Sequence, residues 1–293
     1  MSYTRKRRDH IFFYNGNAVA LGGYIENDGA RTPFDSVAPT VVSIVGGSSH
    51  AQHRDYCFPP KRGIFKRRPP FFIEVKHAES ETWGTERGGR YITVARSRLE
   101  GLNVNNVIKA DVVEAVLESS HPIQRGGESD IRVVTEERES RIEGLKVSNV
   151  KVETRLNRNL TQFTTFAGLN GFIAQPQQAA SANKNPMAMR QSFCEMSLME
   201  PPGPNAPDYV ADLCSFQRPD LIRCTIFESI TPARELDVHG YSINVPEFGR
   251  IFLGELVVTN GQKRLNMIRF DLGCGTSGGG VGGGAGVDGE PVP

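Results

Sequence analysis

The chain has 293 residues, of which 38% are hydrophobic and 23% charged, with a formal net charge of +1. These proportions are typical of a globular protein with a sizeable core, and they exclude a disordered chain. The longest nearly uninterrupted apolar run, Val41–Val45, is far shorter than the about 20 residues that cross a bilayer, so we expect no membrane span.

The N-terminal third predicts a basic tail followed by strands. Residues 1–16 are expected to be the tail, and the globular region to extend over residues 17–274. Alternating apolar and polar residues favour strands at 17–25, 38–45, 71–77 and 90–95. Proline pairs interrupt the basic stretch 54–70, which is therefore predicted to be a loop.

An internal repeat marks the middle of the chain. The segment 97–107 (SRLEGLNVNNV) recurs as 140–150 (SRIEGLKVSNV), with eight of eleven positions identical. Each copy alternates after its glycine and then breaks phase, as a strand with a bulge does. Two copies are too few for a solenoid, so we interpret them as equivalent strands of a duplicated β unit.

The C-terminal third combines a helical insertion, a strand block and a tail. Residues of about 186–217 have helix-like apolar spacing, whereas 221–274 read as four strands. Asn260-Gly261 is the dipeptide that a tight hairpin turn prefers. The glycine-rich residues 275–293 have almost nothing to bury, so they are predicted to be a disordered tail. The sequence thus predicts a mainly β, antiparallel β-sandwich-like fold with a duplicated strand unit and a small helical insertion.

The first candidate site surrounds Trp83, the single tryptophan. Glu81 and Glu86, with other glutamates nearby, would form an acidic loop beside this ring, and such a loop can bind a sugar or a cation. The alternative is a solvated hairpin tip with Trp83 packed underneath, since charged side chains prefer the surface. Trp83, Glu81 and Glu86 are therefore the candidate ligand-binding residues.

Two basic runs are a second candidate. They would bind an anion or nucleic acid, or else be solvated tails and loops, and nucleic acid is not favoured because no aromatic platform accompanies them. Their residues are Arg5, Lys6, Arg7, Arg8, Lys61, Arg62, Lys66, Arg67 and Arg68.

Metal and catalytic signatures are weak. His50, His53 and Cys57 are spaced like metal ligands, but they converge only where the backbone is helical or tightly turned. We expect no metal, no cofactor and no catalytic residue.

One family resemblance emerges from the C-terminal strands. The segment 239–255 (HGYSINVPEFGRIFLGE) and the strand 265–270 (LNMIRF) resemble the choice-of-anchor P type of bacterial proteins, as do the strands within 95–115. The resemblance covers about half of the chain and implies a β-rich exported protein tethered at the cell surface, with no catalytic residues to transfer.

From these observations we expect a non-enzymatic structural or interaction protein, a β-rich scaffold that presents binding surfaces. The alternatives are a carbohydrate-binding or hydrolytic β domain that uses the Trp83 loop, and anion or nucleic-acid binding through the basic runs. The partner is undetermined, with a protein or a second copy of the chain as candidates. No signal peptide is recognised, which predicts the cytoplasm, whereas the resemblance implies the cell surface.

Overall fold

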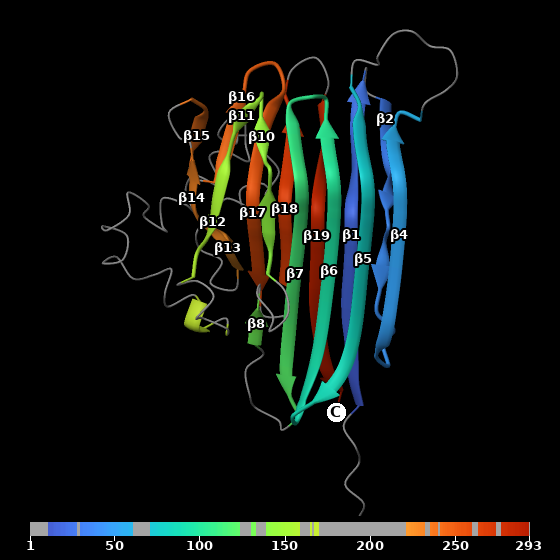
Figure 1. Ribbon diagram of the computed structural model, residues 1–293. Helices are drawn as coiled ribbons and strands as arrows, with labels where there is room; N and C mark the ends of the chain where they lie inside the picture. Colours follow the sequence, from blue (N-terminus) through green and yellow to red (C-terminus); the bar gives the residue numbers. More distant parts are fainter. Residues whose placement is uncertain are drawn as a thin grey trace, which may run out of the picture.

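The fold is built from strands alone, apart from one helical turn at 167–169 in the described part of the chain. The computed structural model describes residues 11–27, 30–60, 71–123, 130–132, 139–158, 165, 167–169, 221–231, 235–239, 241–259, 263–273 and 277–292. Two antiparallel sheets pack face to face, with their long strands nearly aligned (Figure 1). The predicted mainly β, sandwich-like architecture is therefore confirmed.

The nine-stranded sheet joins the two ends of the chain. Its central strand pair is β1 (Ile11–Asn27) and β19 (Ser277–Val292). Next to β19 lie β18 (Lys263–Leu272) and β17 (Gly249–Thr259), and next to β1 lies β2 (Ala30–Val37). The remaining strands are β3 (Thr40–Val41), β13 (Leu221–Thr225), β15 (Asp237–His239) and β16 (Ser242–Val245).

The eight-stranded sheet consists mainly of a meander in the first half of the chain. Its long strands are β4 (Gly47–Phe58), β5 (Ile73–Arg87), β6 (Arg90–Val104) and β7 (Ile108–Pro122), in that spatial order. Short strands extend it beyond β7, namely β8 (Asp130–Arg132), β9 (Arg141–Glu143), β10 (Lys146–Val147) and β11 (Val150–Lys151). A separate pair, β12 (Glu153–Leu156) with β14 (Phe227–Thr231), completes the strands.

The hydrophobic core lies between the inner faces of the two sheets. Because successive strand residues point to opposite faces, every second side chain enters this core. Leu21 of β1, Leu99 of β6, Leu117 of β7 and Leu265 of β18 are all fully buried there. The alternate residues of the same strands point to the two outer faces.

The glycine-rich C-terminal segment is the main correction to the sequence analysis. Predicted to be a disordered tail over 275–293, it forms β19, paired along its length with β1 on one side and β18 on the other. Gly280 has no room for a side chain because two rings fill the space: a Cβ there would lie 2.6 Å from Phe270 Cζ and 2.7 Å from Phe34 Cζ. Two partner strands supply the hydrogen bonds, and large neighbours supply the buried surface, that the segment lacks by itself.

Other local predictions fared differently. Strand β1 begins at Ile11, so the ordered region starts before the predicted boundary at residue 17. The pairing of β17 with β18 confirms the predicted hairpin, although its turn residues 260–262 lie outside the described residues. Most of the basic stretch 54–70 that is described is strand rather than loop, because β4 extends to Phe58. The predicted helical insertion at 186–217 lies outside the described residues.

The two copies of the repeated segment have the same backbone conformation at three matching positions. Gly101 and Gly144 both have φ of 63°, a left-handed value that favours glycine. The turn residues Asn105-Asn106 and Ser148-Asn149 also have positive φ, as a tight hairpin turn requires. The first copy lies in the long β6–β7 hairpin, whereas the second forms the short strands β9 to β11 at the sheet edge.

Within the described ranges, no helix has the length and apolar character needed to cross a bilayer.

Candidate functional site

The outer face of the eight-stranded sheet carries a row of ionic side chains that crosses five neighbouring strands. Ala78, Ser80 and Thr82 of β5 are fully buried toward the other sheet, so the glutamates between and beside them point outward. We call the row the outer-face cluster, and its members are His50 on β4, Glu79 and Glu81 on β5, Arg96 on β6, Glu114 on β7 and Arg141 on β9.

Arg96 is the centre of the cluster. Its Nε donates to Glu114 Oε1 at 2.7 Å, while Nη1 lies 3.3 Å from both Glu79 Oε1 and Glu81 Oε2. Strand register explains this geometry, because Glu81 stands directly opposite Arg96 and the other two carboxylates occupy diagonal positions. The guanidinium of Arg96 on β6 therefore links β5 and β7 through ion pairs.

The interior of the cluster is largely shielded from water. The side chains of Arg96 and Glu114 are 6% and 5% exposed, and Arg141 Nε lies 3.3 Å from Glu114 Oε2 at the cluster's edge. Burial by itself would lower the pKa of Arg96. The hydrogen bond and charge of Glu114, followed by the charges of Glu79 and Glu81, instead raise the pKa above its ordinary value. Arg96 is therefore a permanent cation held by three carboxylates.

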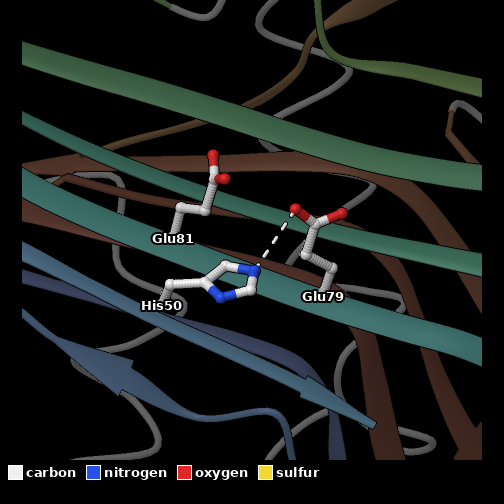
Figure 2. Close-up of side chains that lie close together, drawn as sticks. All are labelled: His50, Glu79 and Glu81. Atoms are coloured by element: carbon white, nitrogen blue, oxygen red, sulfur yellow. Dashed lines mark ion pairs between the residues drawn. The ribbon is translucent and has the colours of Figure 1, made fainter. Parts of the chain in front are cut away.

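His50 forms, with Glu79 and Glu81, a group of three side chains that could bind a metal ion, the one such group among the described residues. Its Nε2 lies 3.5 Å from Glu79 Oε1, and one ligand atom from each of His50, Glu79 and Glu81 lies within 4.8 Å of the others. Figure 2 shows the three side chains on the same face, with the His50 ring directed at Glu79. An imidazole and two carboxylates are a donor set that zinc or manganese accepts.

The position of Arg96 argues against a metal at this place. Its guanidinium contacts both carboxylates, so a divalent cation would have to displace an existing positive charge. The arrangement is that of a satisfied ionic network.

Trp83 lies beside the cluster, in a strand rather than in the predicted acidic loop. Residues 73–87 form β5, and the turn comes at Gly88-Gly89. The Trp83 ring packs against an apolar patch of Ile92, Val94 and Val116 on the same outer face. A loop was expected because charged residues fill the outward positions of the strand, which hides its alternation.

The structure keeps Glu81 near Trp83 but separates Glu86 from it. Glu81 is two residues from Trp83 and thus on the same face, whereas Glu86 is three residues away and on the opposite face. Burial and then the charge of Glu86 raise the pKa of Tyr14, which packs with Phe12 and Tyr91. The three predicted ligand-binding residues therefore do not form one site.

The remaining predicted sites have simple outcomes. His50 and His53 are three residues apart on β4 and point to opposite faces, so they do not converge with Cys57 on a metal. The ring of His53 instead packs edge-on to Tyr56, with ring centroids 5.8 Å apart. The basic residues 5–8, 61, 62 and 66–68 lie outside the described residues.

Sequence reasoning missed Arg96, Glu114 and Arg141, the residues that organise the cluster. One signal was present: Glu79 and Glu81 are two apart, as are Arg96 and Arg98, so each pair must share a strand face. Only the register of β5 against β6 decides that the two pairs meet.

Comparison with protein families gives one match. The family model of a domain of unknown function, DUF8256, matches residues 12–259, which is most of the chain. The chain belongs to the DUF8256 family. The match is to a different family from the choice-of-anchor proteins, so the resemblance to those proteins stays a prediction. No curated protein and no solved structure matches the chain.

The DUF8256 match ends where the nine-stranded sheet is still incomplete. Residue 259 is the last residue of β17, whereas β18 and β19 continue that sheet and connect it to β1. The structural unit is therefore longer at its C-terminal end than the matched region.

Proposed function

We propose that this protein is a non-enzymatic interaction protein that presents the outer face of its eight-stranded sheet to a protein partner. The observation that supports the proposal is the combination, on one sheet face, of the outer-face cluster and the Trp83 patch. In this proposal, the second copy of the repeated segment, residues 140–150, extends the sheet beyond β7 through strands β9 to β11.

The ionic partners of the carboxylates favour binding over catalysis. A general acid or base must exchange a proton with a substrate, so its carboxyl group has to be accessible and its protonation poised. Glu79, Glu81 and Glu114 instead all contact the guanidinium of Arg96, so each carboxylate is already engaged in an ion pair. The hydrolytic alternative needs Trp83 and two nearby carboxylates to converge. It loses support because Glu86 points to the opposite face from Trp83, while Glu81 is paired with Arg96.

The chemistry of the face suits a protein surface. Binding hot spots are enriched in Trp and Arg, and charges fixed at the edge of an apolar patch select a partner of complementary charge. Trp83, which is only partly buried and rests on the buried Val94, supplies the apolar part, while His50 and Arg141 are about half exposed at the two ends of the cluster. The mixed charges of this face favour a partner with alternating charges over a polyanion such as nucleic acid.

A photo-crosslinking experiment tests the proposal in the cells that produce the protein. A photoreactive phenylalanine replaces Gln52, which is exposed on β4 directly opposite Glu79. The matched control carries the same group in place of Asn15, which is exposed on β1 in the other sheet. We expect a discrete protein adduct from position 52 and none from position 15.

A second variant separates specific binding from chance contact. Trp83→Ala, with its thermal unfolding checked, should abolish the adduct formed from position 52. An adduct with twice the mass of the chain would identify a second copy as the partner. Equal adducts from both positions, or an adduct that survives Trp83→Ala, would contradict the proposal. Cell fractionation tests surface attachment separately.

A further inference from the structure

The outer face of the nine-stranded sheet contains a groove that the outer-face cluster does not explain. It has a volume of about 420 Å³, and five of its nine lining residues are glycines from β1 and β19. Tyr24 of β1 borders it on one side, and Arg269 and Asp271 of β18 border it on the other. Its floor is therefore bare peptide backbone, and its walls are chemically different from each other.

Strand register defines the shape of the groove. Gly279 pairs with Tyr24 on one side and with Asp271 on the other, so these three residues form one cross-strand row. In the next outward-facing row, Val281 pairs with Gly22 and with Arg269. Adjacent strands are about 4.8 Å apart, so the Tyr24 and Asp271 backbones stand roughly 10 Å apart, and Gly279 adds no side chain between them. The Asp271 carboxylate reaches over Gly279, since its Oδ1 would lie 3.2 Å from a Cβ there. This spacing admits one flat ring.

Arg269 is fixed before any ligand arrives. Its Nε donates to Glu255 at 3.0 Å, its Nη1 pairs with Asp271, and its Cζ lies 3.7 Å from the centroid of the Phe252 ring. Burial would lower the pKa of Arg269, but the charges of Glu255 and Asp271 raise it. The polar wall therefore presents a cation and a carboxylate side by side, in fixed positions.

The charge of the polar wall selects the class of ligand. Arg269 carries one positive charge, whereas Glu255 and Asp271 together carry two negative charges, so an anionic ligand is repelled. A neutral ligand with adjacent hydroxyl groups can donate to Asp271, which is 46% exposed, and accept from the neighbouring guanidinium. Tyr24, which is 38% exposed, offers the opposite side of the ligand an aromatic face.

We propose that the groove between Tyr24 and Asp271 is a binding site for a neutral saccharide, with one sugar ring lying on the backbone of β19 at Gly279. The volume is within the range of small-ligand sites, about 300–1,000 Å³, and it suits a short oligosaccharide. This site lies on the sheet opposite to the outer-face cluster, so it stands independently of the proposed protein partner.

The structure offers a substitution that fills the groove without straining the backbone. A Cβ on Gly22 would meet its nearest neighbours, Val19 Cγ1 and Ser36 Oγ, at the ordinary distances of 3.6 and 3.7 Å. Gly22→Leu should therefore block the sugar while leaving the fold intact. Tyr24→Ala removes the aromatic wall. Phe13→Ala is the matched control, because Phe13 is an equally exposed aromatic residue of β1 outside the groove.

Isothermal titration of the full chain with neutral hexasaccharides of glucose, N-acetylglucosamine, xylose and mannose tests the proposal, with a sulfated oligosaccharide as the anionic probe. We expect at least one neutral probe to bind with Kd of about 1 mM or tighter, and Gly22→Leu and Tyr24→Ala each to weaken it about tenfold or more. Phe13→Ala should bind like the unmodified chain.

Three results would overturn the site. They are the absence of binding by every neutral probe, tighter binding of the sulfated probe than of the neutral ones, and unchanged affinity in both groove variants. Because none of these readouts involves the eight-stranded sheet, the crosslinking experiment on that sheet can succeed or fail separately.

Discussion

At the scale of single residues, the structure depends on charges that are buried together. Arg96 and Glu114 are at most 6% exposed, although they belong to the outer face of a sheet. Taking two charges out of water costs free energy, and their mutual attraction compensates only when geometry is good and the remaining hydrogen-bonding groups are satisfied. Glu79, Glu81 and Arg141 supply those additional partners.

Replacing Arg96 should therefore strongly lower the free energy of unfolding. Arg96→Met leaves three carboxylates close together with no central cation, and we expect a loss of about 3–5 kcal/mol in the free energy of unfolding. Arg98→Met, on the same strand and face but 27% exposed and paired with Glu100, should cost about 1 kcal/mol or less. Urea denaturation measures both variants. Adding Glu114→Gln to Arg96→Met should restore part of the loss, and equal losses for the two single variants would contradict the assignment.

His121 makes stability depend on pH. Burial and then the charges of Lys263 and Arg90 lower the pKa of His121 from 6.5 to about 4. The folded chain thus binds fewer protons than the unfolded chain between these values, so stability is fully present above about pH 6.5 and falls as the pH decreases toward 4. His121→Gln should show a shallower decrease in its urea midpoint over this window. Parallel curves for both proteins would show that His121 does not titrate as described.

At the scale of elements, β19 shows how a strand can form without strand-forming residues. Glycine weakens a strand because it has no side chain to pack against its neighbours and because its backbone loses much conformational freedom on folding. In β19 the deficit is offset from outside: Phe34 and Phe270 occupy the space above Gly280, and both neighbouring strands pair with it. Larger residues at that position would collide with the two rings.

Gly280→Ala tests this packing. Its added Cβ would meet buried aromatic rings at 2.6 and 2.7 Å, so the unfolding free energy should fall by about 1–3 kcal/mol. Gly22→Ala, in the adjacent strand, adds a Cβ at ordinary contact distance and should change stability little. Chemical denaturation of the two variants gives the comparison. If Gly280→Ala proves as stable as Gly22→Ala, the rings do not constrain β19.

At the scale of the whole molecule, strands from the two ends of the chain pair with each other inside the nine-stranded sheet. β1 and β19 lie side by side, although they come from opposite ends of the sequence (Figure 1). The DUF8256 match covers residues 12–259 and thus omits β18 and β19. Without those strands, β1 and β17 would each expose a long unpaired edge, which is a template for aggregation.

Truncation after Thr259 should therefore prevent stable folding. We expect the shortened chain to aggregate or to lose its cooperative thermal transition, as followed by circular dichroism and gel filtration. Adding a peptide of residues 260–293 during refolding should restore the elution volume and thermal transition of the full chain, because it supplies β18 and β19 as a hairpin. A truncated chain that elutes and unfolds like the full chain would show that these strands are accessory.

Alternation along the chain predicted the mainly β class and the strands around residues 17–25, 71–77 and 90–95, and the dipeptide Asn260-Gly261 predicted the β17–β18 hairpin. These features depend on neighbours in the sequence, so a local pattern is sufficient to reveal them. The full length of β5 and β6 escaped prediction because charged residues occupy their outward positions. Those charges belong to a sheet face, which the sequence does not display.

Tertiary structure alone decided the features on which the two proposals rest. The contact of Arg96 with Glu114 joins residues 18 apart, and it exists only in the observed register of β6 against β7. The groove at Gly279 needs Tyr24 from one end of the chain and Asp271 from the other. A glycine-rich segment carries no local preference for a strand, so the sequence by itself favoured disorder. Strands from both ends of the chain make it the centre of a sheet, because they supply the pairing and the buried surface that glycine lacks.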